Sequence, residues 1–193
     1  MIGYTGHEIP AAPVLVAVVF AGAVLVLRRL RGRLTPLRLV VGLTTVVYAA
    51  GVIGHVLLPY PIGARFPGEE IPWHVWIEPV PFADADPAGI ILNTALFVPL
   101  GVLLPLLVAG TTWRRVLVTG FCLSLTIELV QLIGDLTVSS GRVADVDDLI
   151  GNTVGAVLGY GVLRAVTAVP LLRRVADRAT WPLLDDRARS ARR

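Results

Sequence analysis

The chain has 193 residues, of which 55% are hydrophobic and only 16% are charged. Soluble domains carry about 25% charged residues, so this composition excludes an ordinary water-soluble globule. The formal net charge is +3, but the 17 basic residues are all arginines and lie mostly beside apolar segments, which indicates a membrane protein and no nucleic-acid partner.

Five apolar segments follow one another along the chain. They cover residues 11–27, 37–58, 89–108, 115–134 and 149–169. Each is close to the roughly 20 residues that an α-helix needs to cross about 30 Å of hydrocarbon. The first segment is followed by arginines where a signal peptide would have a small-residue cleavage site, so we expect it to be retained. The sequence therefore predicts an all-α, polytopic bundle of about five transmembrane helices, with membrane lipids as its surroundings.

Three regions follow from this pattern. We expect an N-terminal transmembrane helix and basic loop over residues 1–36, a transmembrane domain over residues 37–169, and a basic tail over residues 170–193. Because that tail mixes arginines with leucines, we expect it to lie on anionic headgroups. The single cysteine, Cys122, lies within an apolar segment and has no partner for an intramolecular disulfide.

The arginines are strongly biased to one side of the predicted bundle. Fifteen lie after the first segment, after the third, or at and beyond the end of the fifth, whereas only Arg65 and Arg142 lie on the other side. Loops rich in arginine stay in the cytoplasm. The N-terminus is therefore predicted outside the cell and the C-terminus in the cytoplasm.

The long outer connection from Pro59 to Ala88 is rich in proline and aromatic residues. Aromatic rings favour the headgroup level of a bilayer. We expect this segment to lie along the outer interface, with a short helix near Trp73 to Ile77, and the alternative is a disordered loop.

Polar side chains interrupt the apolar segments toward the outer side. An ionisable or amide group at membrane depth marks a functional site or an interhelical contact. The candidate ligand-binding residues are Asn93, Glu128, Gln131, Arg142, Asp145, Asp148 and Asn152. From a rise of about 1.5 Å per residue, Glu128 lies about 10 Å below the outer end of its helix, and Asn93 and Gln131 about 6 Å below theirs.

The spacing of these residues places them on two helical stripes. Glu128, Gln131 and Asp135 are related by three and seven residues, and so are Asp145, Asp148 and Asn152. Two such stripes facing Asn93 enclose an outward-facing polar pocket.

Each polar group also has a structural interpretation. Asp145 and Asp148 are typical of a helix start, Asn152 and Gln131 of interhelical hydrogen bonds, and Glu128 with Arg142 of a buried ion pair. The glycines at positions 151, 155 and 159 are typical of close helix packing.

Several ordered motifs resemble one known family. They are the run from Asn93 to Gly101 (NTALFVPLG) with Leu103, Leu104 and Pro105, then Glu128 to Gln131 (ELVQ), then Gly141, Arg142, Asp145, Asp148, Asn152, Thr153 and Gly155. Over roughly Leu58 to Gly159 the chain resembles the VanZ-like proteins. The resemblance implies a small multi-pass protein of the bacterial plasma membrane, in a family whose namesake is associated with resistance to the glycopeptide teicoplanin.

The sequence leaves three functions to consider. The first is a cell-envelope binding protein whose outer pocket takes a glycopeptide or a lipid-linked cell-wall precursor, with Arg142 on a phosphate or carboxylate. The second is a membrane enzyme acting on lipid-linked substrates, with Glu128 as general base and Asp145 or Asp148 on a divalent cation. A transporter is disfavoured, because no charged side chains line a path across the inner half of the membrane apart from Arg164 near its edge. No nucleophile, resident metal or cofactor is predicted, and whether the protein is an enzyme stays open.

Overall fold

Six α-helices account for most of the residues that the structure describes. The computed structural model describes residues 7–31, 34–58, 60–62, 72–83, 86–138 and 143–181. The helices are α1 (Ala11–Arg29), α2 (Pro36–Val56), α3 (Pro87–Leu107), α4 (Trp113–Val138), α5 (Val146–Val166) and α6 (Pro170–Ala179). The first five match the predicted transmembrane segments to within a few residues, and the predicted all-α membrane bundle is confirmed.

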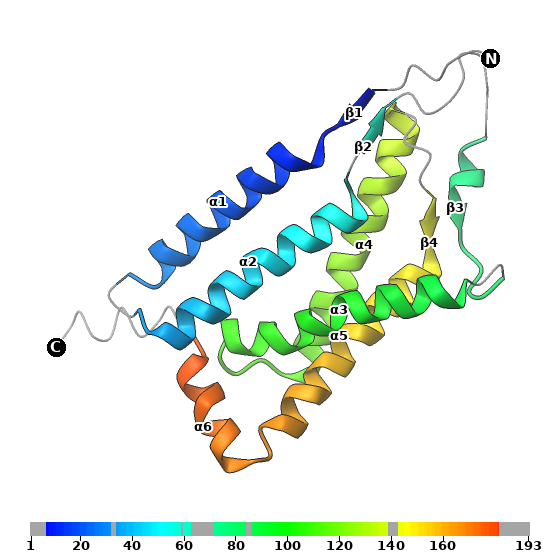
Figure 1. The fold of residues 1–193 in the computed structure, drawn as a ribbon. Helices are drawn as coiled ribbons and strands as arrows, with labels where there is room; N and C mark the ends of the chain where they lie inside the picture. The colour runs from blue at the N-terminus through cyan, green and yellow to red at the C-terminus, as the bar shows by residue number, and fades with distance from the viewer. Residues whose placement is uncertain are drawn as a thin grey trace, which may run out of the picture.

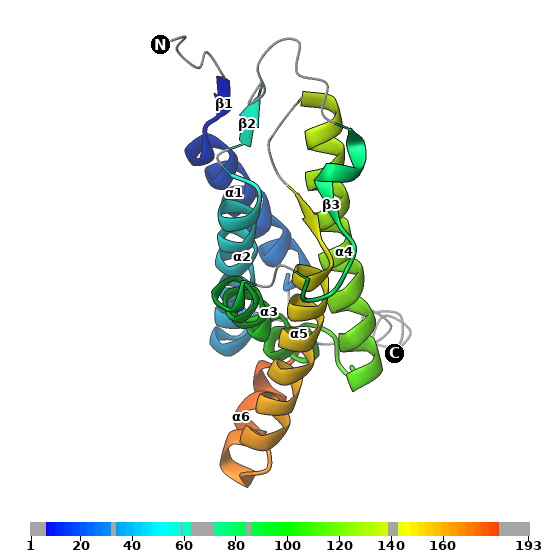
Figure 2. The same cartoon turned by 90° about the vertical axis from the view of Figure 1, so that its right-hand side faces the viewer.

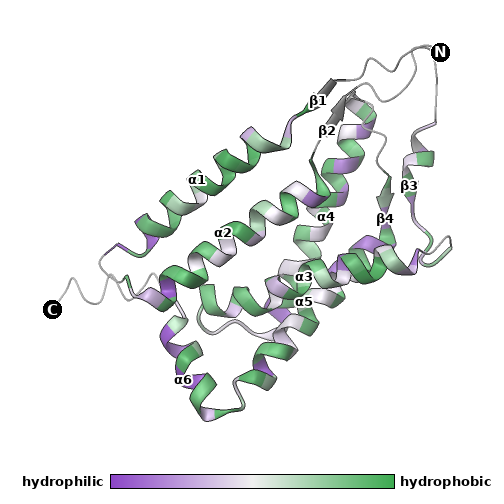
Figure 3. Ribbon diagram, in the orientation of Figure 1, coloured by the Kyte–Doolittle hydropathy of each residue, from purple (hydrophilic) through white to green (hydrophobic). Residues whose placement is uncertain are grey.

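The five long helices are long and apolar enough to cross a membrane. Their outer surfaces carry large apolar side chains, such as Phe20, which is 71% exposed. Figure 3 shows apolar residues along these helices, with hydrophilic residues gathered toward α6 and toward the ends of α3, α4 and α5 near the short strands. An apolar surface of this extent needs lipid around it, so the chain is a multi-pass membrane protein.

The helices pack in three groups. α1 and α2 form a pair on one side, α4 lies on the other, and α3 and α5 lie between them (Figures 1 and 2). α3 and α5 make the most extensive contact in the molecule. A Cβ added to Gly155 or Gly159 would overlap the carbonyl oxygen of Thr94 or Val98, respectively. The predicted close packing at these glycines is confirmed, and α3 and α5 form the central unit of the bundle.

Local sequence signals define the starts of the helices that carry the candidate site. α3 begins at Pro87, and the Asp86 side chain before it accepts hydrogen bonds from the backbone N–H of Ala88 and Gly89 at 3.0 and 3.1 Å. Proline is favoured at the first helical position because its missing N–H would be unpaired there anyway. α3 continues through Pro99 and Pro105, which a membrane helix tolerates when neighbouring groups compensate.

Short strands join segments at the end of the bundle opposite α6 (Figure 1). β1 (His7–Ile9) pairs with β2 (Tyr60–Ile62) in antiparallel fashion, and β3 (Ile77–Glu78) pairs with β4 (Ala144–Asp145) in parallel. The predicted short helix of the outer connection is a 3₁₀ turn over Trp73–Trp76. The connection is thus ordered in its described second half, while residues 59, 63–71 and 84–85 lie outside the described residues.

The C-terminal region folds back onto the bundle. Trp181, which is 8% exposed, packs into an apolar cluster with Leu30, Val41 and Leu103. Its backbone N–H donates to the carbonyl oxygen of Leu106 at 2.8 Å, and its indole Nε1–H donates to that of Arg38 at 3.1 Å. The described first part of the predicted tail is therefore a docked helix and a buried tryptophan. Residues 182–193 lie outside the described residues.

Candidate functional site

The polar residues of the central helices meet at the end of the bundle that carries β3 and β4. α4 runs antiparallel to α5, so that Glu128 lies level with Asp145 and Ser124 lies level with Asn152. Parallel packing of α3 on α5 brings Asn93 to Asp148. Polar residues of α3, α4 and α5 thus lie together in the structure, as the spacing predicted.

Glu128 is a buried carboxyl group that joins two elements of this cluster. Its side chain is 6% exposed, and its Oε2 accepts a hydrogen bond from the backbone N–H of Asp145 at 3.0 Å. Within the described residues it forms no ion pair. The predicted partner, Arg142, lies outside the described residues. Glu128 therefore connects α4 to the start of α5 through a neutral donor.

Asp148 and Gln131 bind to different neighbours. The amide Nδ2 of Asn93 donates a hydrogen bond to Oδ1 of Asp148, which links α3 to α5. The Nε2 of Gln131 donates to the backbone carbonyl of Val56 at 3.3 Å, at the end of α2. Gln131 thus fastens α2 to α4, as its structural interpretation predicted, whereas Asn93 and Asp148 lie beside Glu128.

Asn152 retains one free hydrogen-bonding atom. Its Nδ2 donates to Oγ of the buried Ser124 at 3.0 Å, which confirms an interhelical role. Its Oδ1 is buried and has no hydrogen-bond partner among the described residues, and the side chain is 3% exposed. A buried acceptor without a partner is rare and unfavourable.

Two aspartates form hydrogen bonds at the start of α5. Asp145 is the cap of the helix, because its Oδ1 accepts from the backbone N–H of Asp147 at 2.8 Å. Asp147 is buried, and its two carboxylate oxygens accept from the backbone N–H of Phe82 at 3.0 and 3.2 Å. Phe82 has φ 61°, a left-handed conformation that is uncommon for a bulky residue. Asp147 therefore holds the turn that presents Phe82, whose side chain is 58% exposed.

A hollow of about 200 Å³ opens beside this cluster. Glu128 and Asp145 lie on its wall, and the remaining wall is mostly apolar. Its other lining residues are Ile77, Glu78, Pro79, Leu125, Leu129, Leu132, Ala144, Val146 and Leu149. Drug-sized sites enclose about 300–1,000 Å³. The hollow thus has room for a small apolar group beside the acidic residues Glu78, Glu128 and Asp145.

Among the described residues, no group of three or more histidine, cysteine, aspartate or glutamate side chains is arranged to hold a metal ion.

The sequence matches the VanZ/LLP1 family over residues 45–168, which is more than half of the chain. The chain belongs to the VanZ/LLP1 family. No curated protein and no solved structure matches it. The family match contains every candidate site residue named from the sequence, whereas α1 and α6 of this VanZ/LLP1 protein lie outside it.

Two residues of the VanZ/LLP1 site were not identified from the sequence. Ser124 lies four residues before Glu128, on the same stripe of α4 as Glu128 and Gln131, so extending the stripe by one turn would have found it. Asp147 was not singled out in the sequence. Its partner Phe82 is 65 residues away along the chain, and no local pattern indicates such a contact.

Proposed function

We propose that this VanZ/LLP1 protein resides in the bacterial plasma membrane and binds an amphiphilic molecule of the cell envelope at the outer ends of α3, α4 and α5. A lipid-linked cell-wall precursor fits this proposal best. Binding of this kind is also a route by which the protein would affect sensitivity to teicoplanin, as the resemblance to VanZ-like proteins implies.

One observation carries the proposal. Glu128 and Asp148 come together on neighbouring helices at membrane depth, and neither forms an ion pair within the described residues. A buried carboxylate is unfavourable unless a cation or several donors accompany it. Hydroxyl, amide or ammonium groups of a ligand would supply donors here, and Arg142 is proposed to add a cation for a phosphate or carboxylate.

The adjoining surfaces favour an amphiphile. The 200 Å³ hollow beside Glu128 is lined mostly by apolar residues, and Phe82 is exposed at the same end of the bundle. An acyl or prenyl chain suits such surfaces, whereas an entire glycopeptide is too large for the hollow and would touch only its rim. We therefore rank a lipid-linked molecule above a glycopeptide antibiotic as the ligand.

The test uses the full-length protein in lipid nanodiscs with two probes, a lipid-linked disaccharide-peptide precursor and teicoplanin. We expect the precursor to bind and the Glu128→Gln and Asp148→Asn variants to weaken binding by about tenfold each, as expected for loss of a charge-assisted hydrogen bond. Asp86→Asn is the matched control. It removes one carboxylate at the same end, and asparagine caps a helix as well as aspartate does.

Three results would overturn parts of this proposal. Equal loss in the Asp86→Asn control would attribute binding to general surface charge. Binding of teicoplanin alone would reverse the ranking of ligands. Chemical conversion of the precursor, abolished by Glu128→Gln, would replace the binding protein with the membrane enzyme.

A further inference from the structure

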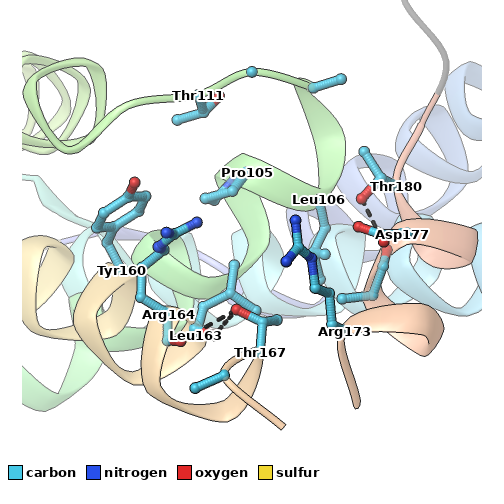
Figure 4. A pocket seen from close by; sticks show the side chains of 14 residues that line it. Pro105, Leu106, Thr111, Tyr160, Leu163, Arg164, Thr167, Arg173, Asp177 and Thr180 are labelled. Atoms are coloured by element: carbon cyan, nitrogen blue, oxygen red, sulfur yellow. Dashed lines mark hydrogen bonds between the residues drawn. The ribbon is translucent and has the colours of Figure 1, made fainter. Parts of the chain in front are cut away.

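A second polar cavity lies at the opposite end of the bundle, where α3 and α5 end and α6 begins. It measures about 580 Å³, the size of a binding site for a small molecule. Its walls are the end of α3, the connection from α3 to α4, one face of α5 and one face of α6 (Figure 4). None of the described residues proposed to bind at the outer end lines it.

Two arginines from different helices converge in this cavity. Arg164 belongs to α5 and Arg173 to α6, and Figure 4 shows both guanidinium groups directed toward the space beneath Pro105 and Leu106. Within the described residues, neither guanidinium has a hydrogen-bond or ion-pair partner. Arginines that converge without partners attract an anion, and their planar donor sets match phosphate oxygens.

The remaining polar groups leave the cavity with an excess positive charge. Asp177 is the one acidic residue among the described residues that line the cavity, so two guanidinium groups face one carboxylate there. The hydroxyls of Thr111, Thr167 and Thr180 donate to the backbone carbonyls of Val108, Leu163 and Ala176 at 2.6, 2.8 and 2.8 Å. Those hydroxyl protons are therefore already used, and the arginines are the principal donors. A phosphodiester, which carries one negative charge, would balance the excess.

α6 is held in place independently of any ligand. The Trp181 contacts to Leu106 and Arg38 fasten its end, and Arg38 Nε also donates to the carbonyl oxygen of Thr180 at 3.1 Å. Arg173 is therefore carried on a docked helix rather than a free tail. Preorganisation of this kind lowers the entropy loss on binding.

The position of the cavity indicates where the anion comes from. The cavity adjoins the ends of two membrane-spanning helices, and so lies at headgroup level. Beside it, Leu171, Leu172 and Val175 of α6 are exposed, as expected for a helix that rests on acyl chains. Arginine bias predicts this face to be cytoplasmic, where anionic lipids are abundant and basic pockets between helices bind their headgroups.

We infer that the cavity between α3, α5 and α6 binds the phosphodiester headgroup of an anionic phospholipid, with Arg164 and Arg173 as its phosphate ligands. Tyr160, one turn before Arg164 on the same face of α5, lines the site with its ring. The acyl chains of the lipid lie along the apolar surface of α6.

The experiment measures lipid binding to the delipidated full-length protein by native mass spectrometry. The probes are phosphatidylglycerol, phosphatidylcholine with the same acyl chains, and inorganic phosphate. The site variant carries Arg164→Gln with Arg173→Gln. The matched control carries Arg174→Gln with Arg178→Gln, which removes the same charge from the same membrane face at residues that do not line the cavity.

We expect phosphatidylglycerol to bind more tightly than phosphatidylcholine, whose ammonium group faces the guanidinium groups unfavourably. The site variant should weaken phosphatidylglycerol binding about tenfold or more, and the control by less than about threefold. Asp177→Asn should strengthen it. Equal losses in the two arginine pairs would show diffuse surface attraction and overturn the inference. Displacement of the lipid by millimolar inorganic phosphate would also overturn it, in favour of a soluble anion.

Folding is monitored by gel filtration and thermal unfolding of each variant. If the glutamine pair does not fold, Arg164→Lys with Arg173→Lys keeps the charge but loses the planar donor set, and should still weaken binding. Unchanged lipid affinity in that lysine pair, together with an unchanged affinity in Asp177→Asn, would contradict the proposed site.

Discussion

At Glu128, one side chain has a structural contact and a proposed binding role. The carboxylate accepts the backbone N–H of Asp145, and glutamine can accept the same bond through its amide oxygen. A glutamine at this position therefore removes the negative charge of Glu128 and keeps the hydrogen bond to Asp145. The structural contact depends on an oxygen acceptor, whereas the proposed ligand contact depends on the negative charge.

We predict that Glu128→Ala lowers the free energy of unfolding by about 1–3 kcal/mol, because a buried backbone N–H loses its acceptor. Glu128→Gln should leave the free energy of unfolding unchanged or raise it, because it removes a buried charge and keeps the acceptor. SDS-induced unfolding of the purified variants measures both. Equal destabilisation by alanine and glutamine would show that the charge itself stabilises the fold, as in a buried ion pair with Arg142.

In the Asn152 side chain, one polar atom makes a contact between helices and the other has no described hydrogen-bond partner. Its Nδ2 connects α5 to Ser124 of α4, while its Oδ1 remains buried without a partner among the described residues. Interhelical hydrogen bonds in membranes contribute only about 0.6 kcal/mol on average. The Ser124 contact alone is therefore a weak reason for an amide at this depth. The unpaired Oδ1 adds to the polar character of the cluster around Glu128 and Asp148.

Among the helices, the contact between α3 and α5 depends on the absence of side chains. We predict that Gly155→Ala lowers the free energy of unfolding by about 2 kcal/mol or more. The added Cβ would overlap the carbonyl oxygen of Thr94, and the α3 backbone could not shift away without losing its packing on α5. Gly161→Ala is the matched control on the same helix, since a Cβ there meets nothing within 4 Å. It should leave the free energy of unfolding unchanged or slightly raised.

SDS-induced unfolding and the fraction of monodisperse protein after purification would report both changes. Similar behaviour of the two glycine variants would mean that α3 and α5 can separate without loss of stability. The hydrogen bond between Asn93 and Asp148 would then be free to open, and the outer site would not be a rigid one.

Elements were predicted well where a local pattern defines them. The five spans follow from uninterrupted apolar runs, and Asp145 was recognised as a cap because capping depends on neighbouring residues. The docking of α6 was missed. Trp181 is buried through contacts with α2 and α3, and an arginine-rich amphipathic segment gives no sign of such distant partners. The Asp147 contact with Phe82 was missed for the same reason, because it joins segments that lie 65 residues apart along the chain.

Across the whole molecule, acidic and basic side chains are separated between the two ends of an apolar bundle. Carboxyl groups gather where α3 and α5 begin, and arginines gather where they end. Because α3 and α5 form one tightly packed unit, both candidate sites are built on the same pair of helices. The orientation of that unit in the membrane decides which candidate site faces which leaflet.

We predict that the carboxylate end faces outward, because arginine-rich loops remain in the cytoplasm. In a Cys122→Ser background, Val80→Cys should react with a membrane-impermeant maleimide in intact cells, since Val80 is exposed beside the turn that presents Phe82. Arg174→Cys on α6 should react only after the cells are permeabilised. The unaltered chain is the control, because Cys122 lies midway along the membrane-spanning α4 and should stay unlabelled. The reverse labelling pattern would place Glu128 and Asp148 on the cytoplasmic side, where an extracellular ligand cannot reach them, and would place the arginine cavity in the outer leaflet.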